Sequence, residues 1–240
     1  MSIVSFKNVN LEFKQSNEKS LRRLILNLLK KNQKADNKLI FSNISFTINQ
    51  GDRVGILGRN GSGKTTILKL INKSFEPNSG EILVKGTVSS LIDLHFGIEG
   101  EATGRENIHL KLLLAGKSKQ YIDANIEKII FFSELQEYID EPVKYYSSGM
   151  LLKLSIAINL NISADILLLD EWLSVGDTFF NKKIEDNLVK KINSSKILFL
   201  ASHSRELIEK YCNKLMLISD HKVKIFENCK KGTKEYFENT

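Results

Sequence analysis

The sequence predicts an α/β protein in which a mixed β-sheet core carries an antiparallel β unit and a helical unit. An apolar strand at 53–57 runs into a glycine-rich segment and then a helix, which is the start of a parallel βαβ arrangement. Two continuous apolar runs, at 166–169 and 197–201, have the character of parallel strands buried on both faces. Residues 39–48 instead alternate apolar and polar side chains, as in an antiparallel sheet with one solvated face.

Composition indicates an ordinary globular chain. Its 240 residues are enough to bury a substantial core, and 42% of them are hydrophobic and 26% charged. No apolar stretch is long enough to cross a bilayer, and Met1 leads into a strand pattern rather than a signal peptide. Cys212 and Cys229 lack a metal-ligand spacing, so we expect free thiols in a reducing compartment. The net charge of +7 comes from lysines interleaved with acids, which favours a solvated surface over a nucleic-acid or membrane-binding face.

Three further strands are predicted ahead of the strand at 53–57. Segments 3–6 and 10–13 are each short and apolar enough to predict a strand. The half-buried strand at 39–48 ends at the turn Asn49-Gln50-Gly51-Asp52.

Helical patterns dominate the middle of the chain. A helix is predicted over Thr66 to Asn72, and helical periodicity runs almost throughout 103–162. Beyond the two buried strands, segments 215–218 and 223–226 are predicted to form a closing hairpin around Asp220 and His221.

The segment 15–38 differs from its surroundings and is predicted to be an inserted amphipathic helix. Its apolar residues recur at i, i+3, i+4, i+7 and i+8, and basic residues flank that stripe. The stripe consists of Leu21, Leu24, Ile25, Leu28 and Leu29, with Arg22, Arg23, Lys30 and Lys31 beside it. Two interpretations are open: a helix that meets a membrane-bound partner, and a surface helix that packs on its own domain.

The glycine-rich segment after 53–57 is predicted to bind ATP. It has the pattern G-x-x-x-x-G-K-T between a strand and a helix. Backbone N–H groups of such a loop can surround phosphate oxygens, and the helix N-terminus adds partial positive charge. Lys64 is expected to reach the β- and γ-phosphates, and the Thr65 hydroxyl to bind Mg²⁺. The predicted phosphate-binding residues are Gly58, Arg59, Asn60, Gly61, Ser62, Gly63, Lys64, Thr65 and Thr66.

Two adjacent carboxylates follow the buried strand at 166–169. Asp170 is expected to hold Mg²⁺ through water, and Glu171 to polarise the water that attacks the γ-phosphorus. A strand that ends in a solvated acidic pair is the alternative for this segment alone. Beside a phosphate-binding loop, the catalytic interpretation is favoured.

The segment Tyr146-Ser147-Ser148-Gly149-Met150 lies just ahead of a helical pattern, where a serine is also an ordinary helix cap. With the phosphate loop before it and the acidic strand after it, the chain resembles the ATP-binding cassette (ABC) superfamily. That resemblance implies a P-loop NTPase fold with a RecA-like mixed core, an antiparallel β subdomain and an α-helical subdomain at about 98–162. It implies one ATP-hydrolysing domain over 1–240 that works as a homodimer. Ser147, Ser148 and Gly149 would contact the γ-phosphate held by the opposite subunit.

Four more residues are assigned by the same resemblance. Asp177, in Ser174-Val175-Gly176-Asp177, falls where the superfamily has a loop between the two nucleotide sites. His203 resembles the histidine that senses the γ-phosphate, and Phe13 the aromatic residue that stacks on adenine, although Phe13 also fits the core. The usual glutamine before the helical subdomain is missing. Asp93 or Leu94 falls near that position, and Asp93 is the candidate metal-linked carboxylate.

This departure, together with Thr103-Gly104-Arg105-Glu106-Asn107-Ile108 and Asp170 to Phe180, resembles the ATPases of bacterial polysaccharide exporters. The resemblance implies export of lipid-linked O-antigen or teichoic acid, with two copies of a separate membrane permease. The chain would then lie peripherally on the cytoplasmic face of the inner membrane. In O-antigen and teichoic acid exporters an inserted helix follows the first strands, so deletion of Glu18 to Lys34 is expected to spare ATP binding and uncouple export.

Other functions remain as alternatives. A capsule exporter ATPase fits all but the insertion. A soluble ABC ATPase that acts on nucleic acid or the ribosome usually joins two cassettes or inserts a coiled coil, and neither pattern is present; we therefore expect no nucleic-acid partner. An importer or drug-efflux ATPase is disfavoured by the missing glutamine and by Ser148. Since the chain ends at Thr240, soon after the closing hairpin, we expect no C-terminal carbohydrate-binding domain.

Overall fold

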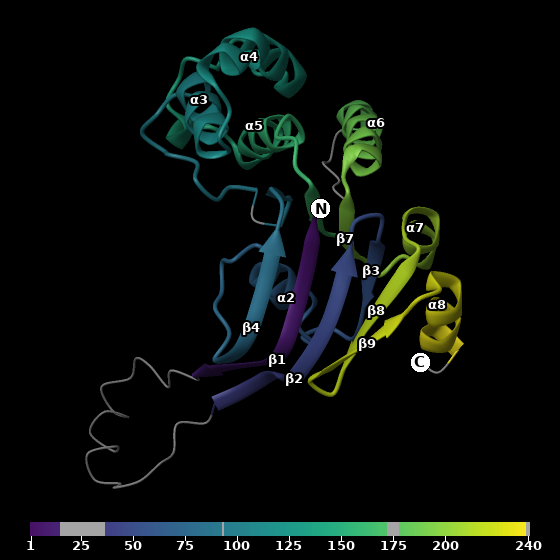
Figure 1. Cartoon of the computed structure of the whole chain (residues 1–240). Coiled ribbons are helices and arrows are strands. Elements are labelled where there is room, and N and C mark those ends of the chain that lie inside the picture. Colours follow the sequence, from purple (N-terminus) through teal and green to yellow (C-terminus); the bar gives the residue numbers. More distant parts are fainter. Residues whose placement is uncertain (15–36, 93, 172–177, 239–240) are drawn as a thin grey trace, which may run out of the picture.

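The computed structural model describes residues 1–14, 37–92, 94–171 and 178–238 (Figure 1). The apolar stripe predicted for the insertion, Asp93 and Asp177 therefore lie outside the described residues. Asn37 and Lys38, which the sequence assigns to the end of the insertion, belong instead to a strand.

The described chain contains two β-sheets. Three antiparallel strands form the first, in the order β2-β1-β4. These are β1 (Ile3–Lys14), β2 (Asn37–Asn49) and β4 (Ser79–Lys85). The second sheet has the order β5-β6-β7-β3-β8-β9, in which every neighbouring pair is parallel except β8 and β9. Its strands are β3 (Arg53–Leu57), β5 (Val88–Ser90), β6 (Ile166–Asp170), β7 (Ile197–Ala201), β8 (Lys214–Ser219) and β9 (Lys222–Phe226).

The two sheets enclose the helix α2 (Lys64–Ile71). Its apolar residues, among them Ile67 and Ile71, share one buried cluster with Phe41 of β2 and Phe199 of β7. At one margin the sheets are also joined directly, because the backbone N–H of Ser42 donates to the carbonyl of His221 at 2.9 Å. The amino-terminal end of α2 is thereby held between the sheets.

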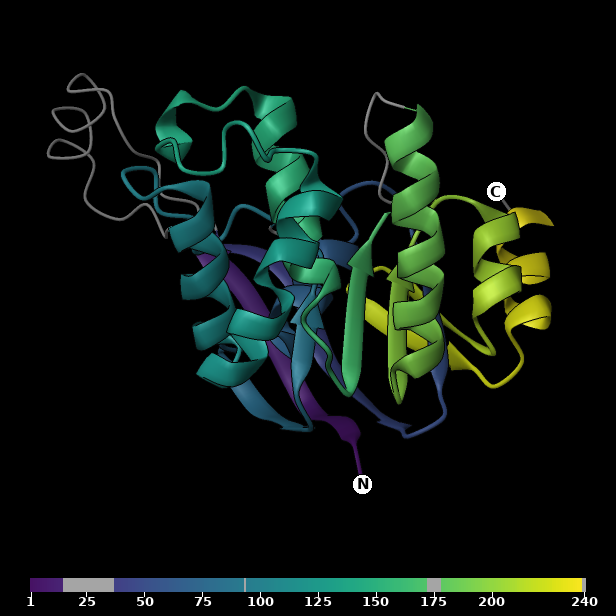
Figure 2. The ribbon, with the colours of Figure 1, turned by 90° about the horizontal axis from the view of Figure 1, so that it is seen from above.

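Helices cover the other face of the second sheet (Figures 1 and 2). A second apolar cluster joins this sheet to α6 (Thr178–Ser194), α7 (Arg205–Tyr211) and α8 (Cys229–Glu238). Cys212 and Cys229 are buried there as free thiols. None of the helices in the described part of the chain combines the length and the apolar character that crossing a bilayer requires.

A helical unit stands at one end of the molecule (Figure 1). It contains α3 (Gly104–Leu114), α4 (Lys119–Ser133), a 3₁₀ turn at Val143–Tyr145 and α5 (Ser148–Leu160). These helices have their own apolar cluster, which includes Ile108, Ile129 and Leu154. A further small cluster of Ile156, Phe180 and Ile184 joins α5 to α6.

The predicted fold class is confirmed: a mixed α/β chain with a parallel core sheet and an antiparallel β unit. The strands themselves differ in detail. Segments 3–6 and 10–13 are one strand, whose register shifts between Phe6 and Val9 while Asn8 takes a φ of 52°. The pattern also missed β4, which is mostly exposed, and β5, which has only three residues.

Candidate functional site

The candidate site lies where three neighbouring parallel strands end. The glycine-rich loop follows β3. Asp170 is the last residue of β6, and Glu171 comes directly after it. Ser202 and His203 follow β7. The carboxyl ends of parallel strands meet at one edge of a sheet, which is where ligands bind in open α/β folds. A cavity of about 520 Å³ opens at this edge. Its lining consists of Phe13, Lys38, Ile40, Asn60, Gly61, Gly63, Lys64, Thr65, Thr66, Asp170, Glu171 and His203.

The loop between β3 and α2 has backbone geometry that glycine permits. Gly61 and Gly63 take φ values of 78° and 111°, in the region that side chains disfavour. A Cβ at Gly63 would lie 2.8 Å from the Phe41 ring, so the loop also passes too close to the core for a larger residue. Gly63 is the N-cap of α2 and has no side-chain cap, so the first N–H groups of that helix remain for a ligand.

Lys64 is buried at the start of α2. Its ammonium group donates to the carbonyl of Gly58 at 2.9 Å and to that of Arg59 at 3.4 Å. Burial lowers the pKa of Lys64 below its ordinary value of 10.5, while the charges of Glu171 and Asp170 act in the opposite direction. The ammonium is thus held at the loop, facing two carboxylates that share its cavity.

Thr65 and Asp170 meet directly. The Thr65 hydroxyl donates to Oδ2 of Asp170 at 2.5 Å, across 105 residues of sequence. A hydroxyl and a carboxylate oxygen are hard ligands of the kind that Mg²⁺ uses, and Mg²⁺ commonly takes one or two protein oxygens with phosphate and water oxygens completing its octahedron. The pair therefore fits a magnesium ion shared with a bound nucleotide.

Glu171 is placed by a strained backbone and by the strand beside it. Its φ is 68°, and its N–H donates to the carbonyl of Ala201 at 2.8 Å. Its carboxylate accepts a hydrogen bond from the Ser202 hydroxyl at 3.3 Å, and the Nε2 atom of His203 lies 3.8 Å from the other carboxylate oxygen. The side chains of Glu171 and His203 are each about half exposed, so both are accessible from the cavity that they line.

The other end of the cavity is formed by the antiparallel sheet. Phe13 is 37% exposed and makes an edge contact with Phe75, at 5.4 Å between ring centroids. The Phe13 ring is thus partly exposed where it lines the cavity, as an aromatic residue that stacks on a flat base would be. Lys38, directly opposite Phe13 in the β1–β2 register, also lines the cavity. Sequence reasoning missed Lys38, since it assigned that residue to the insertion.

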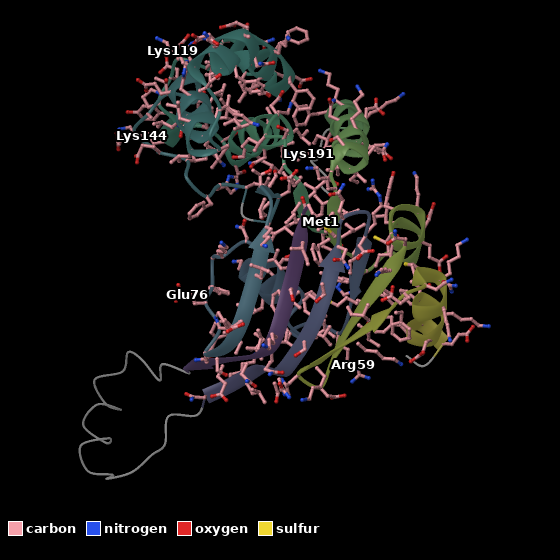
Figure 3. The ribbon with its side chains drawn as sticks, viewed as in Figure 1. Met1, Arg59, Glu76, Lys119, Lys144 and Lys191 are labelled. Atoms are coloured by element: carbon pink, nitrogen blue, oxygen red, sulfur yellow. The ribbon has the colours of Figure 1, made fainter. Side chains whose placement is uncertain are left out.

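Three residues of the predicted phosphate loop, Gly58, Arg59 and Ser62, are not part of the cavity lining. Arg59 and Ser62 line a separate hollow of about 440 Å³ with Ser219, Asp220 and Tyr236. Figure 3 shows Arg59 beside the β8–β9 hairpin, whose residues Ser219 and Asp220 line that hollow. The loop therefore meets the cavity through Asn60, Gly61 and the residues from Gly63 to Thr66.

Ser147, Ser148 and Gly149 are exposed and are absent from the cavity lining in the described chain. Ser147 caps α5, and its side chain accepts a hydrogen bond from the N–H of Met150 at 3.2 Å. The interpretation of Ser147 as a helix cap therefore agrees with this hydrogen bond. Because Ser147 is also exposed, the cap leaves open the interpretation that it contacts a second subunit. The structure brings together the phosphate loop, Asp170, Glu171, His203 and Phe13, and it does not bring Ser147 to them.

Comparison with known families gives one match over most of the domain. Residues 41–174 match the family described as ABC transporter. The matched segment includes the phosphate loop, the segment at Ser147 and the carboxylates at Asp170 and Glu171.

Curated relatives are similar along most of this chain. A teichoic acids export ATP-binding protein of Staphylococcus epidermidis is 40% identical over 205 residues, which are 85% of this chain and 77% of that protein. An O-antigen export system ATP-binding protein of Klebsiella pneumoniae is 38% identical over 78% of this chain and 76% of its own length. One from Myxococcus xanthus is 41% identical over 76% of this chain, which spans only 42% of that longer protein.

Solved structures share the fold. The ATP-binding subunit of an ABC transporter superposes with a TM-score of 0.71 at 16% identity, covering 98% of this chain and 93% of that one. A dimeric ATP-binding cassette bound to ADP and phosphate gives a TM-score of 0.67 at 20% identity, with 93% and 97% covered.

Proposed function

Because this chain belongs to the ABC transporter family, we propose that it is the ATP-hydrolysing subunit of an exporter that moves lipid-linked O-antigen or teichoic acid. One observation of the structure carries the ATPase assignment: Lys64, Thr65, Asp170 and Glu171 come from separate segments and line one cavity. The cargo rests on the relatives named above, whose similarity extends over most of this chain.

The chain positions ATP with few side chains. Loop amides and the α2 amino terminus face the phosphates, Lys64 neutralises the β- and γ-phosphates, and Phe13 carries the base. Thr65 and Asp170 would hold Mg²⁺, which would neutralise charge on the phosphate oxygens when bound. Much of the catalytic effect of such sites comes from positioned charge.

Glu171 acts on the attacking water. Its carboxylate accepts the water proton while the water oxygen forms a bond to the γ-phosphorus. The bond from the γ-phosphorus to the bridging oxygen breaks, and ADP and phosphate leave. Ser202 orients one carboxylate oxygen of Glu171, and His203 lies at the other and lines the same cavity.

A second copy completes each site. Ser147 and Gly149 are exposed and away from their own cavity, so in a symmetric pair they can meet ATP held by the partner chain. The dimeric relative with bound ADP and phosphate supports this arrangement. ATP would join the two chains, hydrolysis would release them, and two permease copies in the inner membrane would bind the pair on its cytoplasmic side.

Substitution of the catalytic carboxylate tests the ATPase mechanism. Glu171→Gln keeps the size of the side chain and removes the base, so ATP binding is retained while turnover falls by about 10²-fold or more. The trapped chain forms a dimer when ATP is added, measured by analytical ultracentrifugation. Substantial residual hydrolysis would show that another group activates the water.

Co-purification tests the exporter assignment. The chain is expected to purify with a polytopic membrane protein encoded beside it, and detergent-solubilised complexes should contain both in equal numbers. Isolation with ribosomes or nucleic acid instead of a membrane protein would contradict the export function and leave the ATPase site intact.

A further inference from the structure

Glu134 joins three helices through one carboxylate. It is the C-cap of α4, where its φ of 57° ends the helix. One carboxylate oxygen accepts from Lys153 of α5 at 2.8 Å, and the other from Lys183 of α6 at 2.6 Å. All three side chains are at most 30% exposed, so this network is shielded more than an ordinary surface ion pair.

The charges and the packing around Glu134 support each other. Hydrogen bonds from Lys153 and Lys183 lower the pKa of Glu134, which keeps it ionised. The Lys153 ammonium also lies 4.7 Å from the ring centroid of Phe180, a fully buried residue of α6. Phe132 of α4 contacts the same ring at 5.6 Å between centroids. The three helices therefore meet at one polar and aromatic junction.

A second contact holds α5 and α6 together at their far ends. Lys191, near the end of α6, donates to the carbonyls of Asn159 and Ile162, each at 2.5 Å. These carbonyls belong to the last turn of α5 and the residues just after it, where a cation is favourable. Figure 3 shows Lys191 on the side of α6 that faces the helical unit.

The helix α6 is anchored in both parts of the molecule. Phe180 and Ile184, in its first half, pack with Ile156 of α5. Leu188 and Ile192, in its second half, pack with the core strands in the cluster that contains Leu169. The helix α6 thus connects the core sheet, whose strand β6 leads to Glu171, with α5, the helix that begins at the segment of Ser147.

We propose that Glu134 is a positioning residue that sets the direction of α5 and so places Ser147 and Gly149 against the ATP held by a second copy of the chain. This inference rests on the proposed dimeric ATPase. Glu134 touches neither the cavity nor its lining. Its effect arises because α5 is held at one end by the Glu134 network and at the other by Lys191, and a tilt of the helix displaces the exposed serine at its start.

The test compares Glu134→Gln with Glu127→Gln, a matched substitution in the same helix. Glu127 pairs at 2.6 Å with Arg105 of α3, entirely within the helical unit, and does not contact α5 or α6 through that bridge. Glu134→Gln leaves two ammonium groups facing a neutral side chain, whereas Glu127→Gln leaves the α4–α5–α6 junction unchanged.

Three measurements separate positioning from folding. ATP affinity of the dilute monomer should stay within about twofold of wild type for both variants, since the cavity is untouched. In the Glu171→Gln background, the dissociation constant of the ATP-bound dimer should rise at least about tenfold for Glu134→Gln and not for Glu127→Gln. With Glu171 present, kcat should fall for Glu134→Gln alone, and Glu134→Asp should restore part of it.

A Lys183→Met variant removes the ion pair between α6 and Glu134 and leaves the one between Glu134 and Lys153 in place. It should change dimerisation in the same direction, which keeps the test decisive if Glu134→Gln lowers the melting temperature. The role of Glu134 would be overturned if Glu134→Gln and Lys183→Met both kept wild-type dimerisation and kcat. It would also be overturned if their monomer ATP affinity fell as much as their dimerisation. A Glu171→Gln chain that stays monomeric with ATP would instead overturn the proposed dimeric site itself.

Discussion

The side chain of Lys191 is buried, with 8% exposed, and its Nζ atom donates to the backbone carbonyls of Asn159 and Ile162. Burial, with the nearby charge of Lys117 as a second cause, lowers its pKa to about 7. Lys111 of α3 is similar: it donates to the carbonyl of Leu94 at 3.1 Å, and burial lowers its pKa to about 8. Lys111 therefore connects α3 to the segment at Leu94, and Lys191 connects α6 to the end of α5.

These two lysines predict that stability rises with pH between 7 and 9. In that window the unfolded chain, with an ordinary lysine pKa of 10.5, binds protons that the folded chain has lost, so the free energy of unfolding increases. The slope approaches about 1.4 kcal/mol per pH unit for each lysine. Lys191→Met should remove its share of the slope and leave that of Lys111, as measured by urea denaturation at pH 7 and pH 9.

Lys190→Met is the control for that experiment, because Lys190 is exposed and adjacent in sequence. It should keep the wild-type slope. An unchanged slope in Lys191→Met would mean that Lys191 retains its proton in the folded chain.

At the level of single residues, sequence reasoning succeeds where chemistry is contiguous. Lys64 and Thr65 belong to one short pattern whose spacing already implies their roles. Lys38 and Glu134 carry no such pattern. Lys38 reaches the cavity only through the register of two strands, and Glu134 acquires its partners from helices that follow it by about 20 and 50 residues in sequence. Contacts of this kind depend on tertiary packing.

At the level of elements, the strands that the sequence predicted are those with a clear burial pattern. Strands β6 and β7 are buried along almost their whole length, and their apolar runs reveal them. Strand β1 looks divided because a bulge interrupts its alternation near Asn8. Strand β4 is mostly exposed, so its side chains carry little hydrophobic signal. Strand β4 is recognised as a strand only by its antiparallel pairing with β1.

Helix α3 begins with a complete capping box, and its loss should be measurable. The Thr103 side chain accepts from the N–H of Glu106 at 3.1 Å, while the Glu106 carboxylate accepts from the N–H of Thr103 at 2.8 Å. Thr103→Ala should lower the free energy of unfolding by about 1 kcal/mol, measured in urea. Thr103→Ser retains the hydroxyl and should cost little; equal losses in both variants would assign the effect to the threonine methyl group.

At the level of the whole molecule, the prediction concerns two chains. A Lys64→Met chain has a defective phosphate loop and an intact Ser147, and a Ser147→Arg chain has the reverse. In a dimer of either variant alone, neither site is complete. A mixture should recover hydrolysis, because a mixed dimer holds one site made from the intact loop of one chain and the intact Ser147 of the other.

Phosphate release across mixing ratios checks this, with a maximum expected near equal amounts. Activity that equals the sum of the two separate variants at every ratio would mean that Lys64 and Ser147 serve the same site within one chain. Wild-type chain diluted with buffer supplies the reference for concentration effects.

The separation of Ser147 from its own cavity also has a genetic consequence. In a cell that makes normal and Glu171→Gln chains in equal amounts, random pairing leaves roughly a quarter of the dimers with two normal chains. Mixed pairs contain one site that binds ATP and does not release it, so they stay closed and occupy the permease. Alleles of this kind should therefore be dominant, and alleles that abolish ATP binding at Lys64 should be far less so, since the one complete site of such a mixed pair keeps its Glu171 and can hydrolyse and release its ATP.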